Sequence, residues 1–154
     1  MKKALPYVLP VLLCFGLGYF ASRLQTDAIA HWYPHLDKPA LTPPNWMFPV
    51  AWGAIYLLSG LSAGLVWNRA GARRKGLLAL WGVQLLFNFL WSILFFTLRN
   101  PLLGLVDIIL LDLLVLGYIL WTWHVVRLAS VLFWPYLVWI GFATCLNAYI
   151  LVFN

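Results

Sequence analysis

Five apolar runs, each about as long as a bilayer is thick, constrain this chain more than any other feature. They lie near residues 4–23, 45–68, 77–98, 102–123 and 129–153, and about 20 apolar residues in a helix span the hydrocarbon core. Only 9% of the residues are charged, against roughly 25% in a soluble domain. The sequence therefore predicts an all-α membrane protein, a bundle of five transmembrane helices that forms one domain over residues 1–154.

The cations lie between the apolar runs and do not follow one helix face. Lys2, Lys3, Arg69, Arg73, Arg74, Lys75 and Arg127 fall on the N-terminal side of the predicted spans, and Arg23, Lys38 and Arg99 on the opposite side. Because cytoplasmic loops carry the excess of Lys and Arg, this bias places the N-terminus in the cytoplasm. The net charge of +6 is thereby explained by membrane orientation, and we expect no nucleic-acid partner.

The longest polar stretch, residues 24–44, is predicted to be a loop between the first two helices. It contains His31 and His35 at i, i+4 spacing, which on a helix could bind a metal, but Pro34 between them disfavours a regular helix. We therefore predict no metal site. A loop of this length and aromatic content is a candidate lid. The run before it is long for a signal peptide, and we interpret it as a retained first helix.

The second helix is expected to begin at about Asn45. Pro43 and Pro44 cannot donate helical hydrogen bonds, whereas Asn45 is a good N-cap residue. Further along, Gly60 and Gly64 form a small-xxx-small pair. Such a pair lets another helix, or another subunit, approach closely.

Three predicted spans carry aromatic and small polar side chains on one face. At ~100° per residue, these stripes are Trp52, Tyr56, Ser59 and Ala63; Trp81, Gln84, Asn88, Trp91 and Phe95; and Tyr136, Trp139, Ala143 and Asn147. Amides inside a membrane either join helices or contact a ligand, and both roles stay open for Gln84 and Asn88. Such an interior suits a flat hydrophobic ligand with a few polar groups.

Two carboxylates lie inside the fourth predicted span. A carboxylate there costs about 3 kcal/mol on insertion scales, so Asp107 must face the bundle, a partner or water. A proton or ligand site and a helix-capping role near Gly104 both stay open. Asp112 lies ~140° around the helix from Asp107, and is either neutral or in contact with a second subunit.

The sequence contains no set of residues that indicates an ordinary enzyme. It offers no nucleophile beside a base, no paired carboxylates on one face and no phosphate-binding glycine loop. We therefore predict no required cofactor.

Several stretches resemble the TspO/translocator protein family, also called the peripheral-type benzodiazepine receptor family. They are KPALTPPNW from Lys38, FPVAWGAIY, QLLFNFLWSILFF, LVDIILL and WPYLVWIGFATCLNAYI, in the family's order. The resemblance implies a five-helix membrane protein, commonly dimeric, with a pocket under the loop between the first two helices. That pocket is expected to bind porphyrins and synthetic benzodiazepine-like or isoquinoline ligands.

The resemblance also assigns roles to residues by position. Trp52 and Trp139 match two tryptophans implicated in porphyrin contact and in the light-dependent porphyrin breakdown reported for some members, so they are catalytic only if that photo-oxidation occurs. Asn88, Trp91, Asp107, Ala143 and Leu146 match other pocket or near-pocket positions. With the residues that share their faces, the expected ligand-binding set is Trp46, Trp52, Tyr56, Gln84, Asn88, Trp91, Asp107, Trp139, Ala143, Leu146 and Asn147.

The function expected from the residues and the resemblance together is a membrane receptor or sensor for porphyrins. Tetrapyrrole transport, light-dependent porphyrin degradation and a structural assembly role are the alternatives. The expected partners are the bilayer, a porphyrin or other planar ligand, and a second copy of the chain. Mitochondrial relatives also bind cholesterol, but that motif needs an aromatic followed by a cation. Here Ala148 follows Asn147, so we do not expect sterol recognition by this route.

Overall fold

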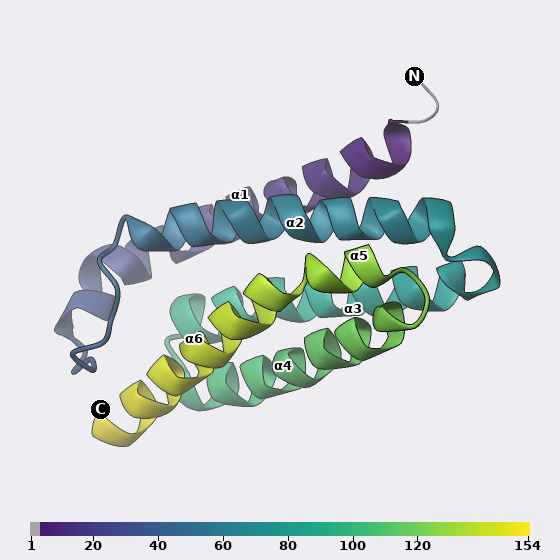
Figure 1. Ribbon diagram of the computed structural model, residues 1–154. Helices are drawn as coiled ribbons and strands as arrows, with labels where there is room; N and C mark the ends of the chain where they lie inside the picture. The colour runs from purple at the N-terminus through teal and green to yellow at the C-terminus, as the bar shows by residue number, and fades with distance from the viewer. Residues whose placement is uncertain (1–3) are drawn as a thin grey trace.

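Five helical segments long and apolar enough to cross a membrane form one bundle in the computed structural model, which describes residues 4–154. Figure 1 shows them running alternately in opposite directions. The helices are α1 (Leu5–His31), α2 (Met47–Arg69), α3 (Arg74–Ser92), α4 (Pro101–Trp123), α5 (Arg127–Val131) and α6 (Trp134–Phe153), with a π-helical segment at Ile93–Thr97 and 3-10 turns at Tyr33–His35 and Gly71–Arg73. The predicted all-α, five-span fold is confirmed. Lys2 and Lys3, which entered the charge count, lie outside the described residues.

The first helix is longer than predicted, and the loop that follows it is shorter. Helix α1 ends at His31, so residues 24–31 are helical and not part of the 24–44 loop. Within this stretch, Thr26 Oγ1 donates to the carbonyl oxygen of Ser22 at 2.9 Å. Ala28 is buried. Helix α1 is about 40 Å long and exceeds the hydrocarbon thickness, so it must tilt or project beyond it.

The start of α2 also differs from the prediction. The helix begins at Met47, its N-cap position is Trp46, and no side chain caps it. The Met47 amide instead donates to the carbonyl oxygen of Pro44 at 2.9 Å. A backbone turn after the two prolines therefore leads into the helix, and no side chain caps it. The prediction of Asn45 as N-cap was wrong.

The fifth predicted helix, 129–153, is interrupted. Helix α5 ends at Val131, and α6 starts at Trp134 with a proline in its first turn. Pro135 has no amide hydrogen to donate to Val131, and its ring clashes with the carbonyl four residues before it, which favours a break at this point. The prediction of a continuous helix missed this signal.

The turn into α4 agrees with the prediction of a tight turn at residues 99–101. Arg99 has a positive φ of 49°, which ends the preceding helix. Asn100 then caps α4, because its side-chain oxygen accepts from the Leu103 amide at 3.0 Å. Pro101 fills the first helical turn, where its missing donor costs nothing.

Helices α1 and α2 pack unusually closely through glycines. A Cβ atom at Gly60 would lie 2.5 Å from the Cα atom of Val11, and one at Gly64 would lie 2.3 Å from the ring of Tyr7. The sequence left open whether this small-xxx-small pair admits another helix or another subunit. The structure shows that it admits α1 of the same chain.

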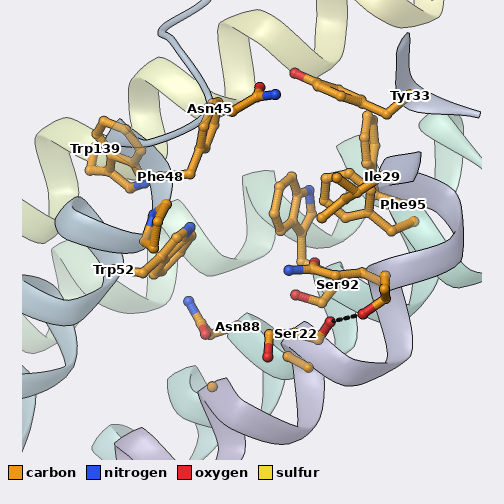
Figure 2. Close-up of a pocket in the computed structure, with 18 of the residues that line it drawn as sticks. Ser22, Ile29, Tyr33, Asn45, Phe48, Trp52, Asn88, Ser92, Phe95 and Trp139 are labelled. Carbon is orange, nitrogen blue, oxygen red and sulfur yellow. Dashed lines mark hydrogen bonds between the residues drawn. The ribbon is translucent and has the colours of Figure 1, made fainter. Parts of the chain in front are cut away.

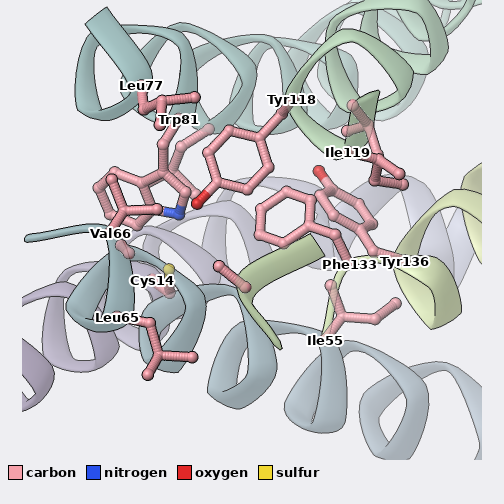
Figure 3. Close-up of a cluster of buried hydrophobic side chains, with 14 of the residues drawn as sticks. Cys14, Ile55, Leu65, Val66, Leu77, Trp81, Tyr118, Ile119, Phe133 and Tyr136 are labelled. Carbon is pink, nitrogen blue, oxygen red and sulfur yellow. The ribbon is translucent and has the colours of Figure 1, made fainter. Parts of the chain in front are cut away.

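The half of the bundle near the α2–α3 turn is a filled core (Figure 3). Tyr118 and Phe133 pack with ring centroids 4.3 Å apart, and the Ser62 hydroxyl lies 3.0 Å from the Tyr118 hydroxyl. Trp81 donates from Nε1 to the Ser59 hydroxyl at 3.0 Å. These polar contacts join helices, and they leave the opposite half of the bundle as the place for a cavity.

The close α1–α2 contact predicts that adding one methyl group at Gly60 destabilises the protein. We expect Gly60→Ala to lower the free energy of unfolding by about 1–3 kcal/mol, because the added methyl group must displace the backbone of α1. The matched control is Gly82→Ala on α3, where a Cβ atom meets nothing within 4 Å and the higher helix propensity of alanine should be neutral or stabilising. Thermal unfolding in detergent compares the two. Equal melting temperatures for the two variants would contradict the packing described above.

Candidate functional site

A cavity of about 700 Å³ lies inside the bundle at the end where α1 leads into α2. Its walls come from the second half of α1, the start of α2, the end of α3 with its π-helical segment, and α6. Asn45 and Tyr33 lie at one side of it and Asn88 at the opposite side (Figure 2). We call this cavity the bundle pocket.

Two aromatic walls face each other across the bundle pocket (Figure 2). On one wall the ring of Trp52 stacks on Tyr56, with centroids 5.6 Å apart and planes at 28°. Trp139 packs beside it, edge-on to Phe48. On the facing wall Trp91 stacks on Phe95 at 5.4 Å and 16°. Offset stacking of this kind holds the rings rigid and presents their flat surfaces.

The π-helical segment Ile93–Thr97 builds the second wall. The Leu98 amide donates to the Ile93 carbonyl oxygen, five residues back, at 2.8 Å, and both Phe95 and Phe96 line the pocket. An extra residue in the turn changes which side chains face inward, and such insertions are frequent at functional sites. Nothing in the hydrophobic pattern of this run signalled it.

A chain of hydrogen bonds crosses the floor of the bundle pocket. The Asn88 side chain donates from Nδ2 to the Tyr136 hydroxyl at 2.9 Å and accepts from the Tyr56 hydroxyl at 3.4 Å. Higher up, Asn147 accepts from Trp91 Nε1 at 3.2 Å and donates to the carbonyl oxygen of Pro101 at 2.8 Å. Both amides thus join helices and also line the pocket. Contact of Asn88 with a ligand stays a prediction.

Helix α1 supplies a third, polar wall that sequence reasoning missed. Ser22, Gln25, Thr26 and Ile29 line the pocket, at the i, i+3, i+4, i+7 spacing of one helix face. This spacing is readable in the sequence. It was overlooked because residues 24–44 were interpreted as a loop, in which no helical face exists.

Eight of the eleven expected ligand-binding residues line the bundle pocket: Trp52, Tyr56, Asn88, Trp91, Trp139, Ala143, Leu146 and Asn147. Three do not. Trp46 is 64% exposed, Gln84 is fully buried and donates to the Trp81 carbonyl oxygen at 2.9 Å, and Asp107 is buried outside the pocket lining. Gln84 therefore lies in the core and not in the pocket lining, and its hydrogen bond is to a carbonyl oxygen of its own helix, α3.

The two carboxylates of α4 occupy different surroundings. Asp107 Oδ2 is buried without a hydrogen-bond partner among residues 4–154, and no capping contact of Asp107 is formed there. Asp112 Oδ2 accepts from Thr144 Oγ1 of α6 at 2.7 Å, whereas its Oδ1, like Asp107 Oδ2, is buried without a hydrogen-bond partner among residues 4–154. Asp112 thereby links α4 to α6.

No charged side chain lines the bundle pocket within the described residues. His31 lies instead beside Asp27, at 3.1 Å, and Asp27 also binds Arg99 at 2.7 Å. No three His, Cys, Asp or Glu side chains converge anywhere in residues 4–154. The described lining can therefore stack on a ligand and hydrogen-bond to it, but it holds no ionised group for acid–base catalysis.

Residues 32–46, which we call the lid segment, are folded around one cation. Lys38 Nζ donates to the carbonyl oxygens of Tyr33 and Leu36 at 2.8 and 2.9 Å and of Pro34 at 3.3 Å. Burial raises the pKa of the Tyr33 phenol above its usual range, so this pocket-lining group stays a neutral hydrogen-bond donor. Asn154 anchors the segment to α6, because it accepts from the Asp37 amide at 2.8 Å.

A membrane protein with five spanning helices and a ligand-sized aromatic pocket inside the bundle is the class that this fold and site define. The model of the TspO/MBR family matches residues 10–153, and the chain belongs to that family. It is accordingly an integral, multi-pass membrane protein.

The chain is similar to proteins from an archaeon, a bacterium and an animal. The chain is 41% identical over 150 residues to the tryptophan-rich protein TspO of Archaeoglobus fulgidus, covering 97% of both chains. It is 37% identical to the tryptophan-rich sensory protein of Cereibacter sphaeroides, over 75% of this chain and 72% of that one. It is 35% identical to the human translocator protein, over 86% of this chain and 80% of the relative.

The three carbonyl contacts of Lys38 predict that the lid segment depends on this ammonium group. We expect Lys38→Met, which keeps the apolar stem, to speed hydrogen exchange of the amides in residues 35–42 by roughly tenfold, since about 1.4 kcal/mol of local stability is lost. Exchange in α3 should not change.

Lys75→Met is the matched control, because Lys75 is exposed and lies in the first turn of α3, which is far along the chain from the lid segment. Exchange measured by mass spectrometry compares the two variants with the unaltered protein. Unchanged exchange in Lys38→Met would contradict the role of this cation.

Proposed function

We propose that this protein is a membrane receptor or sensor that binds porphyrins, or similar planar tetrapyrroles, in the bundle pocket. The observation that carries the proposal is the pair of facing aromatic walls around an uncharged cavity. A volume of about 700 Å³ falls within the ~300–1,000 Å³ of small-molecule sites. Stacked rings on both sides favour a flat ligand over a globular one. Flat benzodiazepine-like and isoquinoline ligands suit the same walls.

The polar groups of the pocket suit the edge of such a ligand. Asn88 lies at the floor, and Ser22, Gln25 and Thr26 line the α1 side; all four can donate and accept hydrogen bonds. Porphyrin carboxylates would not be neutralised by the described lining, so we place them toward the lid segment and the membrane surface. The sensory role agrees with the name of the Cereibacter sphaeroides relative.

The orientation proposed from the charge bias is consistent with this function. It puts the α2–α3 turn in the cytoplasm and the lid segment on the other side of the membrane. A dimer, which the family resemblance implies, would use a helix face other than the one containing Gly60 and Gly64, since α1 covers those glycines.

Transport of tetrapyrroles is less well supported by the packing. The bundle pocket occupies one half of the bundle, and the half near the α2–α3 turn is filled by buried side chains such as Trp81, Tyr118 and Phe133 (Figure 3). Passage would require this core to open. Binding requires no such rearrangement.

The tryptophans of one wall predict a difference in affinity between variants. We expect Trp139→Phe and Trp52→Phe each to weaken protoporphyrin binding about three- to tenfold, because part of a stacking surface worth roughly 0.7–1.4 kcal/mol is lost. The matched control is Trp46→Phe, whose ring is exposed outside the pocket. Titration in the dark, followed by quenching of tryptophan fluorescence, measures the three affinities. Unsaturating quenching, equal in all variants, would mean partition into detergent and would overturn the proposal.

Light-dependent porphyrin degradation is a second candidate, favoured because both Trp52 and Trp139 lie on the same pocket wall. Indole is neither an acid nor a base at neutral pH, so any such reaction would be redox chemistry with oxygen beside an excited porphyrin. We expect product in light but not in darkness, and less product in Trp139→Phe at saturating porphyrin. If free porphyrin in detergent gives the same product at the same rate, this second function fails.

A further inference from the structure

The end of the bundle remote from the pocket carries positive charge from two separate parts of the chain. Arg69, Arg73, Arg74 and Lys75 surround the α2–α3 turn, and Arg127 begins α5; all five are exposed. Figure 1 shows the α2–α3 turn and the start of α5 at the same end of the bundle. We call these five residues the basic end.

No acidic side chain balances the basic end. The chain has four acids: Asp27 lies near the end of α1 and Asp37 in the lid segment, and Asp107 and Asp112 lie inside α4. Asp112, the nearest of these along α4, is about 16 Å from the end of that helix by its rise per residue, beyond the ~10 Å Debye length at 0.1 M salt. Within residues 4–154, no salt bridge involves the basic end, and both that occur use Asp27.

Stability of α3 does not explain these cations. Helix α3 starts at Arg74 without an acidic residue in its first turn and without a side-chain cap. Positive side chains at a helix N-terminus are unfavourable, because the helix dipole is positive there. Arg73, Arg74 and Lys75 therefore repel one another and the helix terminus, and an external anion would relieve both repulsions.

Partly exposed tryptophans lie on the last turns of α2 and α4, next to the basic end in the chain. Trp67, Trp121 and Trp123 are each about 40% exposed, and the Arg127 guanidinium lies 4.3 Å from the Trp123 ring centroid. Tryptophan is favoured at the level of lipid headgroups. A ligand for this surface must therefore present an anion and tolerate an apolar border, which a phospholipid does and a soluble acidic protein does not.

We propose that the basic end binds the headgroups of anionic phospholipids and enriches them around this end of the bundle. A basic segment beside a membrane helix attracts such lipids by about fivefold per cation at most. The enrichment is independent of the bundle pocket and of the function proposed for it.

The test uses the protein reconstituted in phosphatidylcholine bilayers, with trace phosphatidylglycerol or phosphatidylcholine spin-labelled in the acyl chain. Electron paramagnetic resonance gives the ratio of the two association constants at the protein boundary. We expect the ratio to be roughly two to five at 0.1 M salt. At 1 M salt, where the Debye length is ~3 Å, it should fall toward one.

Matched variants locate the effect. Arg73→Gln/Arg74→Gln/Lys75→Gln should bring the ratio near one at 0.1 M salt, and Arg74→Gln alone should lower it in part. The control is Arg23→Gln, an exposed arginine on α1 near the pocket, which should leave it unchanged. Should the triple variant fail to fold, the salt dependence of the ratio in the unaltered protein still tests whether the association is electrostatic. A ratio near one in the unaltered protein, or an equal loss in Arg23→Gln and Arg74→Gln, would overturn the inference and leave the cations only the role of setting orientation.

Discussion

The close contact of α1 with α2 is the interaction on which the rest of this structure depends. Gly60 and Gly64 admit the backbone of α1, and Gly18 in turn admits the Tyr56 ring, since a Cβ atom there would lie 2.2 Å from it. In a bilayer no hydrophobic force drives helices together, so close packing of small residues has to do so. This contact directs the polar face of α1, with Ser22 and Gln25, toward α3 and α6. The bundle pocket exists because α1 is held there.

The polar side chains inside the bundle have different roles in its two halves. Near the α2–α3 turn, these side chains form hydrogen bonds between helices, as between Ser62 and Tyr118. Around the pocket, Asn88 and Asn147 join helices and also border the cavity. Such amides hold their positions without a ligand, because their helix partners fix the rotamers. A ligand would therefore meet a preorganised surface, which reduces the entropy lost on binding.

Much of this architecture follows from the sequence, because a membrane admits few alternatives. Backbone groups in hydrocarbon must bond internally, so apolar runs of sufficient length give the five spans. The stripes on the second, third and fifth spans contain seven of the eight expected ligand-binding residues that line the pocket, and the family resemblance added Leu146. The secondary structure of polar stretches follows less directly from the sequence. The stretch from residue 24 to His31 was predicted to be a loop because it is polar, yet it is helical because its polar face borders a cavity.

Features that depend on three-dimensional packing were not predictable from one sequence. The π-helical segment that brings Phe96 to the pocket beside Phe95 has no marker in the hydrophobic pattern. The assignment of Gln84 to the core required knowing which helix faces which. The break before α6 is different, since Pro135 marks it and was overlooked.

The central claim is that a planar ligand enters between the aromatic walls of the bundle pocket. The most direct test follows the indole N–H resonances of the ten tryptophans by nuclear magnetic resonance during titration with protoporphyrin in the dark. Each resonance is assigned by a single Trp→Phe substitution. We expect Trp52, Trp91 and Trp139 to shift saturably, while Trp46, Trp67 and Trp123 stay unchanged. Shifts that grow linearly at all ten positions, or that saturate only outside the pocket, would contradict the account.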